Sequence, residues 1–449
     1  MSDVIVVGGG AAGWAAALAA AQGGLSVALV EKLAESGGSS ALSGGCLAFA
    51  GTDLQTAAGV TDSPDQLFAD LREVGQEMND EALVRTYCEA QLATYDWLKE
   101  AGVRFSPVIE TASGQSVPRV HTVDPADMVR ALKAAALATG QVEYHPNCAA
   151  QALESDAAGR ITGVRLADGT TLDAVRGVVL ASGGFAKNPE LLMHYAPQYA
   201  EAVFVAGAGS QGDGLRMGLA QGAGLADMAF VKGTFGKHPT DETNDHSLQA
   251  VYKGAIAVNQ DGQRFVDESI SYKLLGDAVM AQPWHTAYQI LDQGIFDTGD
   301  DRVRILDFGR RLEEGLFYVA DSLDELARQI EIEPEVLAAT VARYNGFVDS
   351  GHDAEFGRSS LVHHHGQLRR IETAPFYAYP STAVVFGTYC GLTIDSAARV
   401  LRQDGSVIPG LYAAGEVTGG FHGAAYMTGS ALGKAVVFGR IAGQTLAAQ

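Results

Sequence analysis

The chain has 449 residues and a formal net charge of −22 at pH 7. At roughly 150 residues per domain, this length predicts two or three domains with ample material for a core. The acidic balance argues against a nucleic-acid partner, because phosphates need a basic surface, and against docking on anionic lipid. We therefore expect a cytoplasmic protein that its negative charge keeps in solution.

Neither a metal site nor an attached redox centre is expected from the sequence. The four cysteines are widely spaced and form no CxxC pair and no cluster with histidine, which argues against iron–sulfur, haem and zinc sites. The tract His363–His365 has no acid or thiolate at metal-binding spacing nearby in the chain, so we interpret it as solvated surface. The cysteines are Cys46, Cys88, Cys148 and Cys390.

The first 32 residues predict a β–α–β unit. Met1 leads directly into an apolar strand at residues 4–7, without the basic segment of a signal peptide. A glycine turn and an Ala-rich helix follow, and residues 25–32 form the second strand. Because no apolar run in the chain reaches roughly 18 residues, we expect no membrane span.

The next elements alternate between loops, helices and a hairpin. A Gly/Ser loop covers residues 35–52. Helices are expected within 64–105, where a Ser cap and a Pro mark the start, and within 124–139. Residues 160–184 predict a hairpin with an Asp-Gly turn and then a buried strand, and another helix is expected within 212–224.

Residues 228–380 differ in composition from the sequence before and after them. They hold most of the long charged segments, such as residues 322–348, whereas the glycine-rich apolar pattern returns from residue 381. We therefore predict an α/β protein with a discontinuous first domain, residues 1–227 and 381–449, and an inserted second domain, residues 228–380.

A dinucleotide-binding motif opens the chain. Gly8, Gly10 and Gly13 form G-x-G-x-x-G between a strand and a helix. The first glycine allows a tight turn, the second lets backbone approach a pyrophosphate, and the third lets the helix pack on the strand. The positive N-terminal end of the helix then faces the phosphates. Glu31 ends the second strand, where its carboxylate can accept hydrogen bonds from ribose hydroxyls.

Two later segments favour FAD over NAD as the dinucleotide. Gly415 and Glu416 follow a short apolar strand, as in the segments of two-dinucleotide-domain flavoproteins that contact the ribityl chain and the pyrophosphate. Ala181, Ser182 and Gly183 form a further glycine turn after a strand, suited to passing near adenosine. Three glycine turns around one nucleotide exceed what a plain NAD domain needs.

These motifs together resemble those of the flavoprotein family that contains fumarate reductase, succinate dehydrogenase and the 3-ketosteroid dehydrogenases. The resemblance covers nearly the whole chain and rests on VVGGGAAG, EKLAESGGSSALSGG, GSQGDGLRMG, GQRFVDES and IPGLYAAGEVTGGFHGAAYMTGSALGKAVVFGRIAG, in that order. It implies a Rossmann-type FAD-binding domain and a mobile α+β capping domain, with the substrate at their junction. Members with covalently attached flavin carry a His in the loop that follows the first Glu. The loop here, GGSSALSGG, has none, so FAD is expected to be non-covalent.

The motif and the resemblance together imply further FAD contacts. These come from the first helix, the end of the second strand, the Gly/Ser loop, two later positions at 149 and 213, and the start of the last helix. The residues are Ala11, Ala12, Lys32, Gly38, Ser39, Ser40, Ser43, Gly44, Gly45, Ala149, Asp213, Ser430, Ala431 and Leu432.

The chain departs from the fumarate-type pattern at two arginines. In those members an Arg after the H-G motif holds a substrate carboxylate, as a guanidinium fork does well. Here His422 and Gly423 remain, but Tyr426 stands at the Arg position. The proton-donating Arg that follows R-F-V-N-E is likewise replaced by Tyr272. A dicarboxylate clamp is therefore not expected.

Tyrosines at these two places look like the ketosteroid dehydrogenase branch. The resemblance implies that Tyr272 accepts a proton alpha to a ketone, while Tyr426 binds the ketone oxygen with help from a backbone N–H of Gly429 or Ser430. A hydride from the beta carbon goes to the flavin. His422 is expected near substrate or flavin, although a satisfied buried histidine remains an alternative. For either tyrosine the alternative is a core aromatic, since the chain has 15 tyrosines.

The sequence leaves two alternatives for the role of each of two further side chains. His238, in an H-P-T segment, echoes a histidine of the fumarate-type members but sits several residues late, so a loop histidine without a role is an equal alternative. Lys273, next to Tyr272, either lowers the pKa of that phenol or is simply exposed.

We therefore predict an FAD-dependent dehydrogenase that introduces a double bond alpha,beta to a ring carbonyl. The chain is shorter than typical steroid members, which favours a small ring ketone such as an oxocyclohexane derivative, with a steroid still open. The electrons would pass to an external acceptor such as oxygen, a quinone or a carrier. The alternatives are a reductase of an activated alkene such as an enoate, and a flavin-binding subunit without turnover. The oligomeric state stays open.

Overall fold

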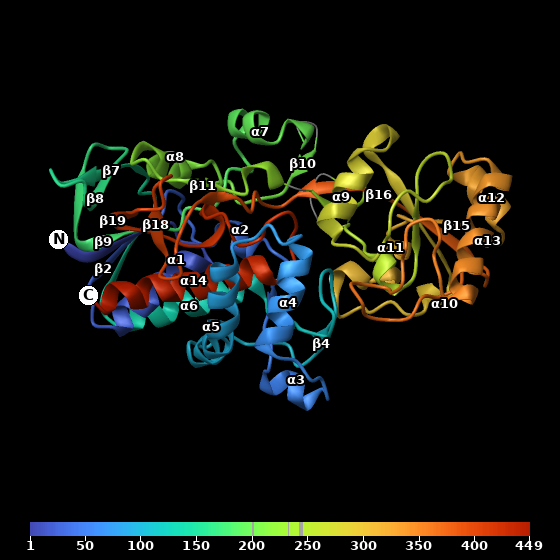
Figure 1. Ribbon diagram of the computed structural model, residues 1–449, viewed down its shortest axis with the longest axis horizontal. Helices are drawn as coiled ribbons and strands as arrows, with labels where there is room; N and C mark the ends of the chain where they lie inside the picture. Colours follow the sequence, from blue (N-terminus) through green and yellow to red (C-terminus); the bar gives the residue numbers. More distant parts are fainter. Residues whose placement is uncertain (200–201, 232, 242–245) are drawn as a thin grey trace.

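The computed structural model describes residues 1–199, 202–231, 233–241 and 246–449. Two sheets divide it into the main part, residues 1–227 and 386–449, and the capping part, residues 228–385. Figure 1 shows the main part at the left and the capping part, in yellow and orange, at the right. Among the described residues, no helix is long and apolar enough to cross a membrane.

The main part is built on an eight-stranded sheet with the order β18-β19-β9-β1-β2-β6, in which β19, β9, β1, β2 and β6 are parallel. The hairpin β7–β8 extends it from β9, and β18 pairs antiparallel with β19. The strands are β1 Ser2–Val7, β2 Val27–Val30, β6 Val142–His145, β7 Ala150–Ser155, β8 Ile161–Leu166, β9 Thr171–Leu180, β18 Arg399–Leu401 and β19 Val407–Ala413.

The parallel register brings the glycine turns to one edge of this sheet. Val7 pairs with both Val30 and Leu180, and Leu180 also pairs with Ala413. The carboxyl ends of β1, β2, β9 and β19 therefore lie side by side, although they come from the beginning, middle and end of the chain. Ligands of open α/β sheets bind at this edge.

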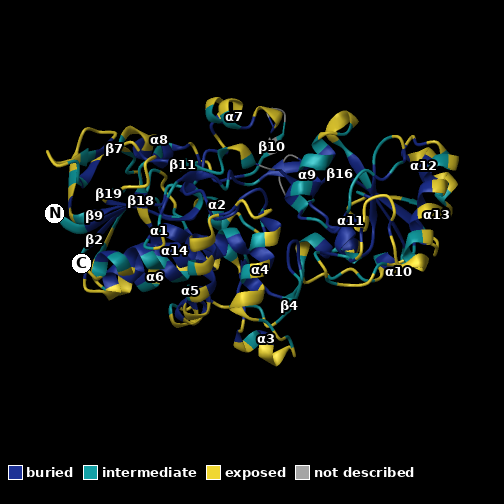
Figure 2. Cartoon of the chain, viewed as in Figure 1, coloured by how far each residue is buried: buried dark blue, intermediate teal, exposed yellow. Residues whose placement is uncertain are grey.

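A buried helix pair covers the sheet. Every residue of α1 (Ala11–Gln22) from Ala11 to Ala21 is buried. The C-terminal helix α14 (Ser430–Ala447) packs closely on α1, because a Cβ at Gly439 or Gly443 would lie only 2.4 Å from a carbonyl oxygen of α1. Figure 2 shows both helices mostly in the dark blue of buried residues. Ala and Gly at the contact let the two backbones approach each other.

Shorter elements complete the main part. The helix expected within 124–139 is α6 (Pro125–Ala138), and the one within 64–105 is broken into α4 (Pro64–Val74) and α5 (Glu81–Glu100) by a turn with positive φ at Gln76 and Glu77. The remaining elements are α2 Gly38–Ala41, β3 Cys46–Ala48, α3 Asp53–Ala57, β4 Ile109–Glu110, β5 Val120–Thr122, α7 Pro189–Tyr195, α8 Asp213–Ala220, β11 Leu225–Ala226 and β17 Gly391–Leu392.

The capping part is built on a six-stranded sheet around the long strand β16 (Phe376–Val385). Strand β10, from the main part, pairs with the end of β16, so this sheet crosses both predicted borders, at 227 and at 380. The other strands are β10 Val203–Phe204, β12 Thr234–Lys237, β13 Ile256–Val258, β14 Ala287–Asp292 and β15 Tyr318–Ala320. The helices are α9 Tyr272–Met280, α10 Gln293–Phe296, α11 Phe308–Glu313, α12 Leu323–Gln329 and α13 Pro334–Ser350.

The RFVDES segment is held by a buried charge network inside the capping part. The Arg264 guanidinium donates to both carboxylate oxygens of Glu268, at 2.9 and 2.7 Å, and to Asp353 at 2.9 Å. Arg358 adds a second buried guanidinium, 3.3 Å from Glu268. Breaking such a buried pair costs roughly 3–5 kcal/mol, because it leaves an uncompensated charge. The network therefore anchors the segment that leads into Tyr272.

Candidate active site

A large cavity lies along the carboxyl edge of the main sheet and extends to the capping part. It brings together most residues that the sequence analysis assigned to the cofactor and three of those assigned to catalysis. These are Gly8, Gly10, Ala11, Ala12, Glu31, Lys32, Gly38, Ser39, Ser40, Ser43, Gly44, Ala181, Ser182, Gly183, Asp213, Tyr272, Gly415, Glu416, His422, Tyr426, Ala431 and Leu432.

The first glycine turn has the tight geometry that its motif requires. Gly8 has φ +111°, and a Cβ there would lie 2.4 Å from the carbonyl oxygen of Ala181. A Cβ at Gly13 would lie 1.9 Å from the carbonyl oxygen of Gly8, so only glycine lets α1 pack this close to the turn. Glu31 accepts backbone hydrogen bonds from Gly9 at 2.8 Å and from Leu33 at 2.9 Å, which orient its carboxylate at the end of β2.

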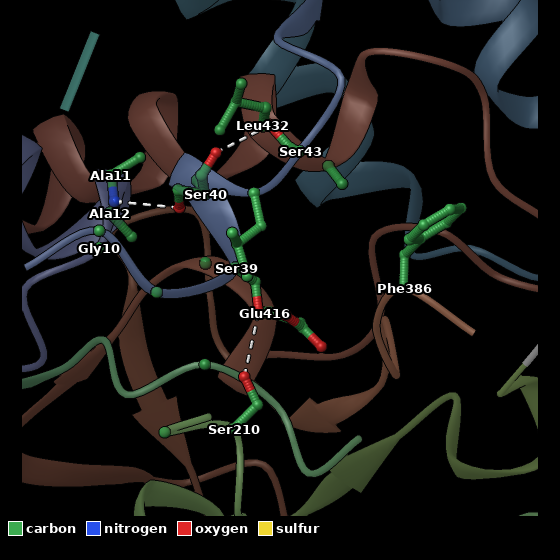
Figure 3. Close-up of a pocket in the computed structure, with 18 of the residues that line it drawn as sticks. Gly10, Ala11, Ala12, Ser39, Ser40, Ser43, Ser210, Phe386, Glu416 and Leu432 are labelled. Atoms are coloured by element: carbon green, nitrogen blue, oxygen red, sulfur yellow. Dashed lines mark hydrogen bonds between the residues drawn. The ribbon is translucent and has the colours of Figure 1, made fainter. Parts of the chain in front are cut away.

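Hydroxyl groups surround the start of α1. The Ala11 N–H donates to Ser40 Oγ at 3.2 Å, and the Oγ atoms of Ser39 and Ser210 lie 3.0 Å apart. Ser43 Oγ donates to the carbonyl oxygen of Ser40 at 2.8 Å. Figure 3 shows these serines on the cavity wall between the start of α1 and Phe386. Helix N–H groups and hydroxyls are suitable donors for a pyrophosphate.

An ion pair lies at the nucleotide end of the cavity. Lys32 Nζ is 2.5 Å from Asp213 Oδ2, although the two residues are 181 positions apart, and both side chains are partly exposed. The pair joins the end of β2 to the start of α8. Both residues were assigned to the cofactor from the sequence, and the cavity wall includes both.

The backbone of the cavity fits a bound FAD. A Cβ placed on Gly38 or on Gly44 would meet no atom within 4 Å, and both glycines line the cavity. The space beside these backbones is therefore open, next to the helix N-terminus and the three glycine turns. This is the cradle that an extended dinucleotide needs.

Five predicted residues lie off the cavity wall. Gly13 and Gly45 shape it indirectly, because a Cβ on either would lie within 2.0 Å of a carbonyl oxygen. Ala149 was expected to contact FAD, but its neighbours on each side form the wall in its place. Gly429 and Ser430 follow Tyr426 at the start of α14, and Ser430 is fully buried.

Tyr272 and Tyr426 meet at the other end of the cavity. Their ring centroids are 5.8 Å apart and the planes are inclined at 65°, an edge-to-face arrangement. Tyr272 is the first residue of α9 in the capping part, whereas Tyr426 belongs to the loop before α14 in the main part. The site is therefore assembled only when the two parts are in contact.

Backbone hydrogen bonds hold the two tyrosine segments together. Ser271 Oγ donates to the carbonyl oxygen of Tyr426 at 2.9 Å, and the Tyr272 N–H donates to Ser113 Oγ at 2.9 Å. The Thr428 N–H in turn donates to the carbonyl oxygen of Ser113 at 3.0 Å. Ser113 lies between β4 and β5, and nothing in the sequence marked it as a positioning residue.

Three more aromatic side chains that the sequence analysis missed line this end: Tyr252, Phe386 and Tyr389. The ring of Tyr389 stacks on that of Tyr426, with centroids 5.0 Å apart and an interplanar angle of 21°. Tyr389 has φ +56°, which is rare for a bulky residue and aims the ring at the site. The wall around the tyrosines is thus largely apolar.

Burial keeps both phenols protonated near neutral pH. It raises the pKa of Tyr272 well above the ordinary phenol value, and the neighbouring Tyr426 and Tyr389 add to the effect. The pKa of Tyr426 is raised to about 12 by burial, opposed by a hydrogen bond from the Gly429 N–H. That N–H donates to Tyr426 Oη at 3.1 Å.

The hydrogen bond from the Gly429 N–H to Tyr426 Oη changes the role that we expected for this N–H group. The Gly429 N–H was expected to bind a ketone oxygen, but it polarises the Tyr426 hydroxyl instead. The Ser430 N–H donates to the carbonyl oxygen of Met427 at 3.1 Å. Tyr426 Oη is therefore the donor available to a substrate oxygen in this arrangement.

His422 lines the cavity and has one ring nitrogen without a hydrogen-bond partner among the described residues. Ser430 Oγ donates to the carbonyl oxygen of Met427 at 2.8 Å, so in its 3.4 Å contact with His422 it acts as acceptor from Nδ1–H. Nε2 is buried without a partner among the described residues. Burial, together with Lys434 and Lys273, lowers the pKa of His422 well below its ordinary value. The ring is neutral, with a lone pair ready for a hydroxyl or an N–H group.

Lys273 is buried and not exposed, which removes one of the two alternatives left by the sequence. The other alternative is not supported either, because the pKa of Tyr272 is raised and not lowered. Its Nζ donates to Thr234 Oγ1 at 2.7 Å and lies 4.5 Å from the centroid of Tyr389. Burial lowers the pKa of Lys273 to about 7, opposed by Glu416 and Asp277. His238 lies off the cavity wall, and its Nδ1 is 2.9 Å from Thr240 Oγ1.

Comparisons with known proteins support the assignment of this cavity to FAD. A model of the family described as FAD binding domain matches residues 3–432. A fumarate reductase (cytochrome) from Shewanella frigidimarina is 34% identical over 425 residues, covering 92% of this chain and 71% of that protein. A urocanate reductase from Eggerthella lenta is 32% identical over 463 residues, covering 99% of this chain and 74% of that protein.

A solved structure is similar over the whole chain. The 3-ketosteroid-delta4-(5alpha)-dehydrogenase from Rhodococcus jostii, in complex with 4-androstene-3,17-dione, matches with a TM-score of 0.81 at 26% identity. The match covers 100% of this chain and 97% of that one. The resemblance seen in the motifs and the α/β fold are thereby confirmed. The chain belongs to the FAD binding domain family and is an FAD-dependent oxidoreductase that acts on CH–CH groups or C=C bonds.

Proposed function

We propose that the protein dehydrogenates a cyclic ketone that carries no anionic group near the reacting carbons, forming a double bond alpha,beta to the carbonyl. The observation that carries the proposal is the meeting of Tyr272 and Tyr426 at the inner end of the cavity. Both stand where the sequence pattern of fumarate-type members has arginines. A neutral phenol can polarise a ketone oxygen but cannot neutralise a carboxylate as a guanidinium does.

Each tyrosine has a distinct task in this reaction. Tyr426 Oη, polarised by the Gly429 N–H, donates a hydrogen bond to the ketone oxygen and stabilises the charge that develops there. Tyr272 removes the proton from the alpha carbon in the small fraction of molecules in which its phenol has already lost its own proton to solvent. FAD, when bound, would supply the acceptor for the hydride from the beta carbon, and an external acceptor such as oxygen, a quinone or a carrier would take up the electrons. The surrounding aromatic rings make this end of the cavity largely apolar, so these interactions act at a low local dielectric constant.

A ring substrate suits the wall of this end of the cavity. Tyr252, Phe386 and Tyr389 present flat apolar faces, and Lys273 is engaged with Thr234. Among the described residues, the cations on the cavity wall are Lys32, Arg304 and Lys434. Lys434 lies in the C-terminal segment with Tyr426, but its Nζ donates to the carbonyl oxygen of Thr418 at 2.9 Å, and Lys32 and Arg304 lie outside both segments that carry the arginines of the fumarate-type pattern.

The second candidate is the reverse reaction, reduction of an activated alkene. It is favoured by the relatives at 32–34% identity, which are named as reductases of fumarate and of urocanate. The raised pKa of Tyr272 also suits a proton donor, because the phenol stays protonated near neutral pH. The two candidates use the same residues and differ in the direction of electron flow.

An anaerobic half-reaction distinguishes the two candidates. The purified holoenzyme is mixed with saturated ring ketones, 3-ketosteroids and dicarboxylates, and the oxidised flavin band is followed. We expect a ring ketone to bleach the band and to yield the alpha,beta-unsaturated product, with no bleaching by succinate. If no ketone bleaches it, while an enoate reoxidises dithionite-reduced enzyme, the reductase is the correct function.

The pH dependence gives an independent test of direction. As the base in dehydrogenation, Tyr272 must be a phenolate, and below its raised pKa that fraction increases tenfold per pH unit. We therefore expect the rate of flavin reduction by the ketone to rise by up to about tenfold per unit between about pH 6 and pH 9. A proton-donating Tyr272 in the reductase would stay protonated over this range. Stopped-flow measurement of a rate that does not change with pH would count against Tyr272 as the base.

A further inference from the structure

Two histidines and a glutamate meet where the capping part touches the main part. His364 Nε2 lies 2.8 Å from Glu73 Oε1, although the residues are 291 positions apart. His363 Nε2 lies 3.8 Å from Glu73 Oε2 and 3.9 Å from Asp70 Oδ1. One ligand atom from each of Glu73, His363 and His364 lies within 4.8 Å of the other two.

One of the three ligand atoms lacks a partner. His363 Nε2 is buried and has no hydrogen-bond partner among the described residues, while its side chain is only 11% exposed. Leaving such a buried polar atom unsatisfied costs roughly 1–3 kcal/mol. A ligand in the space beside it would remove that cost.

The donor set selects a class of ion. Two imidazoles and one carboxylate suit Zn²⁺ and similar divalent transition metals, whereas Mg²⁺ and Ca²⁺ prefer all-oxygen sites. Zinc binds such ligands at about 2.0–2.2 Å, so two ligand atoms on one ion can be at most about 4 Å apart. The distances of 2.8 and 3.8 Å, to the two carboxylate oxygens of Glu73, are within that limit. The three ligand atoms lie within 4.8 Å of one another, so a shift of about 1 Å would bring them all into range. A water molecule or Asp70 would complete the coordination.

We propose that Glu73, His363 and His364 form a binding site for a divalent transition metal ion, which fastens the capping part to the main part. The metal site is distinct from the cavity, since none of its three residues is on the cavity wall.

The metal site is linked to the active site on both sides. On one side, Glu73 is near the end of α4, and Gly75 lies in the turn that follows. The carbonyl oxygen of Gly75 accepts a hydrogen bond of 3.1 Å from the N–H of Ala424, two residues after His422. The His363 N–H donates to the carbonyl oxygen of Ser269, three residues before Tyr272. An ion held here would therefore slow the separation of the two segments that carry the tyrosines.

Zinc titration of the holoenzyme tests the binding site. Protein purified without a histidine tag is titrated with Zn²⁺ by calorimetry. We expect one ion per chain with a dissociation constant on the order of micromolar or tighter, and an affinity at least about tenfold weaker in His364→Ala and in Glu73→Gln. His365→Ala is the matched control, because it shortens the same tract but leaves the three ligands. Its affinity should equal that of the unaltered protein.

Two results would overturn the binding site. One is the absence of stoichiometric Zn²⁺ binding. The other is equal affinity in Glu73→Gln and in the unaltered protein, which would mean that the histidine tract binds zinc alone. Because this measurement needs no substrate, it does not depend on the proposed reaction.

Hydrogen exchange tests the fastening. With one equivalent of Zn²⁺ we expect backbone amides of residues 269–272 and of the 361–366 loop to exchange more slowly in the unaltered protein and in His365→Ala, but not in Glu73→Gln. Unchanged exchange rates in a protein that binds Zn²⁺ at this site would show that the ion does not fasten the two parts.

Discussion

Replacing Tyr272 by Phe is expected to lower the rate of ketone-driven flavin reduction by about 10²–10⁴-fold, because it removes the group that accepts the alpha proton. The aromatic ring remains, so its edge-to-face contact with Tyr426 and the start of α9 are retained. The amount of bound FAD and its reduction by dithionite should therefore be unchanged. Stopped-flow absorbance at the oxidised flavin band measures the rate.

Tyr344→Phe is the matched control for this substitution. The Tyr344 hydroxyl is buried in α13 without a hydrogen-bond partner among the described residues, and the side chain is not on the cavity wall. The Tyr344→Phe variant loses the same kind of oxygen atom at a position off the cavity wall, and its rate should stay within about twofold of that of the unaltered enzyme. A Tyr272→Phe enzyme that keeps its full rate would remove Tyr272 from the mechanism.

Tyr426→Phe is expected to lower the same rate by about 10²–10³-fold, the usual effect of losing one oxyanion donor, or about 2.7–4 kcal/mol. The loss has two parts, since the substrate oxygen loses its donor and the Gly429 N–H loses its acceptor at 3.1 Å. Because the interaction strengthens as charge develops, kcat should fall more than KM rises. Steady-state kinetics with the best ketone of the panel separates the two constants.

The two tyrosine variants should also differ in their pH profiles. Tyr426→Phe retains the base, so its remaining activity should still rise with pH, whereas the remaining activity of Tyr272→Phe should lose that rise. A fall in KM alone, or a rate equal to that of Tyr344→Phe, would show that Tyr426 does not bind the ketone oxygen.

The FAD-binding elements could be predicted from the sequence because each rests on a local requirement. Gly8 must adopt a positive φ, and Gly13 must leave room for a carbonyl oxygen, so glycine at these positions signals the turn directly. The apolar strands that precede the turns signal a parallel sheet in the same way. Once those strands are parallel, their carboxyl ends meet at one edge, which explains why most of the predicted cofactor residues share a single cavity wall.

The two tyrosines that we propose to react were recognisable for a different reason. Tyr272 and Tyr426 stand at positions where the fumarate-type motif pattern has arginine, and a change of side-chain chemistry at a fixed position is visible without coordinates. The role of the Gly429 N–H was not predictable, because it depends on the distance of 3.1 Å to the Tyr426 hydroxyl. That distance is set by the turn that precedes α14.

The motifs alone thus identify the cofactor, the sheet edge that holds it and the two tyrosines that we propose to react. Which other residues surround these tyrosines depends on the packing of distant elements. Tyr389 reaches the site through an unusual backbone conformation, and Glu73 meets His364 across 291 positions. Such contacts form when separate elements pack together, and no local turn, period or cap records them in the chain. The sequence analysis therefore interpreted the histidine tract as solvated surface, although in the folded protein the tract lies beside a carboxylate.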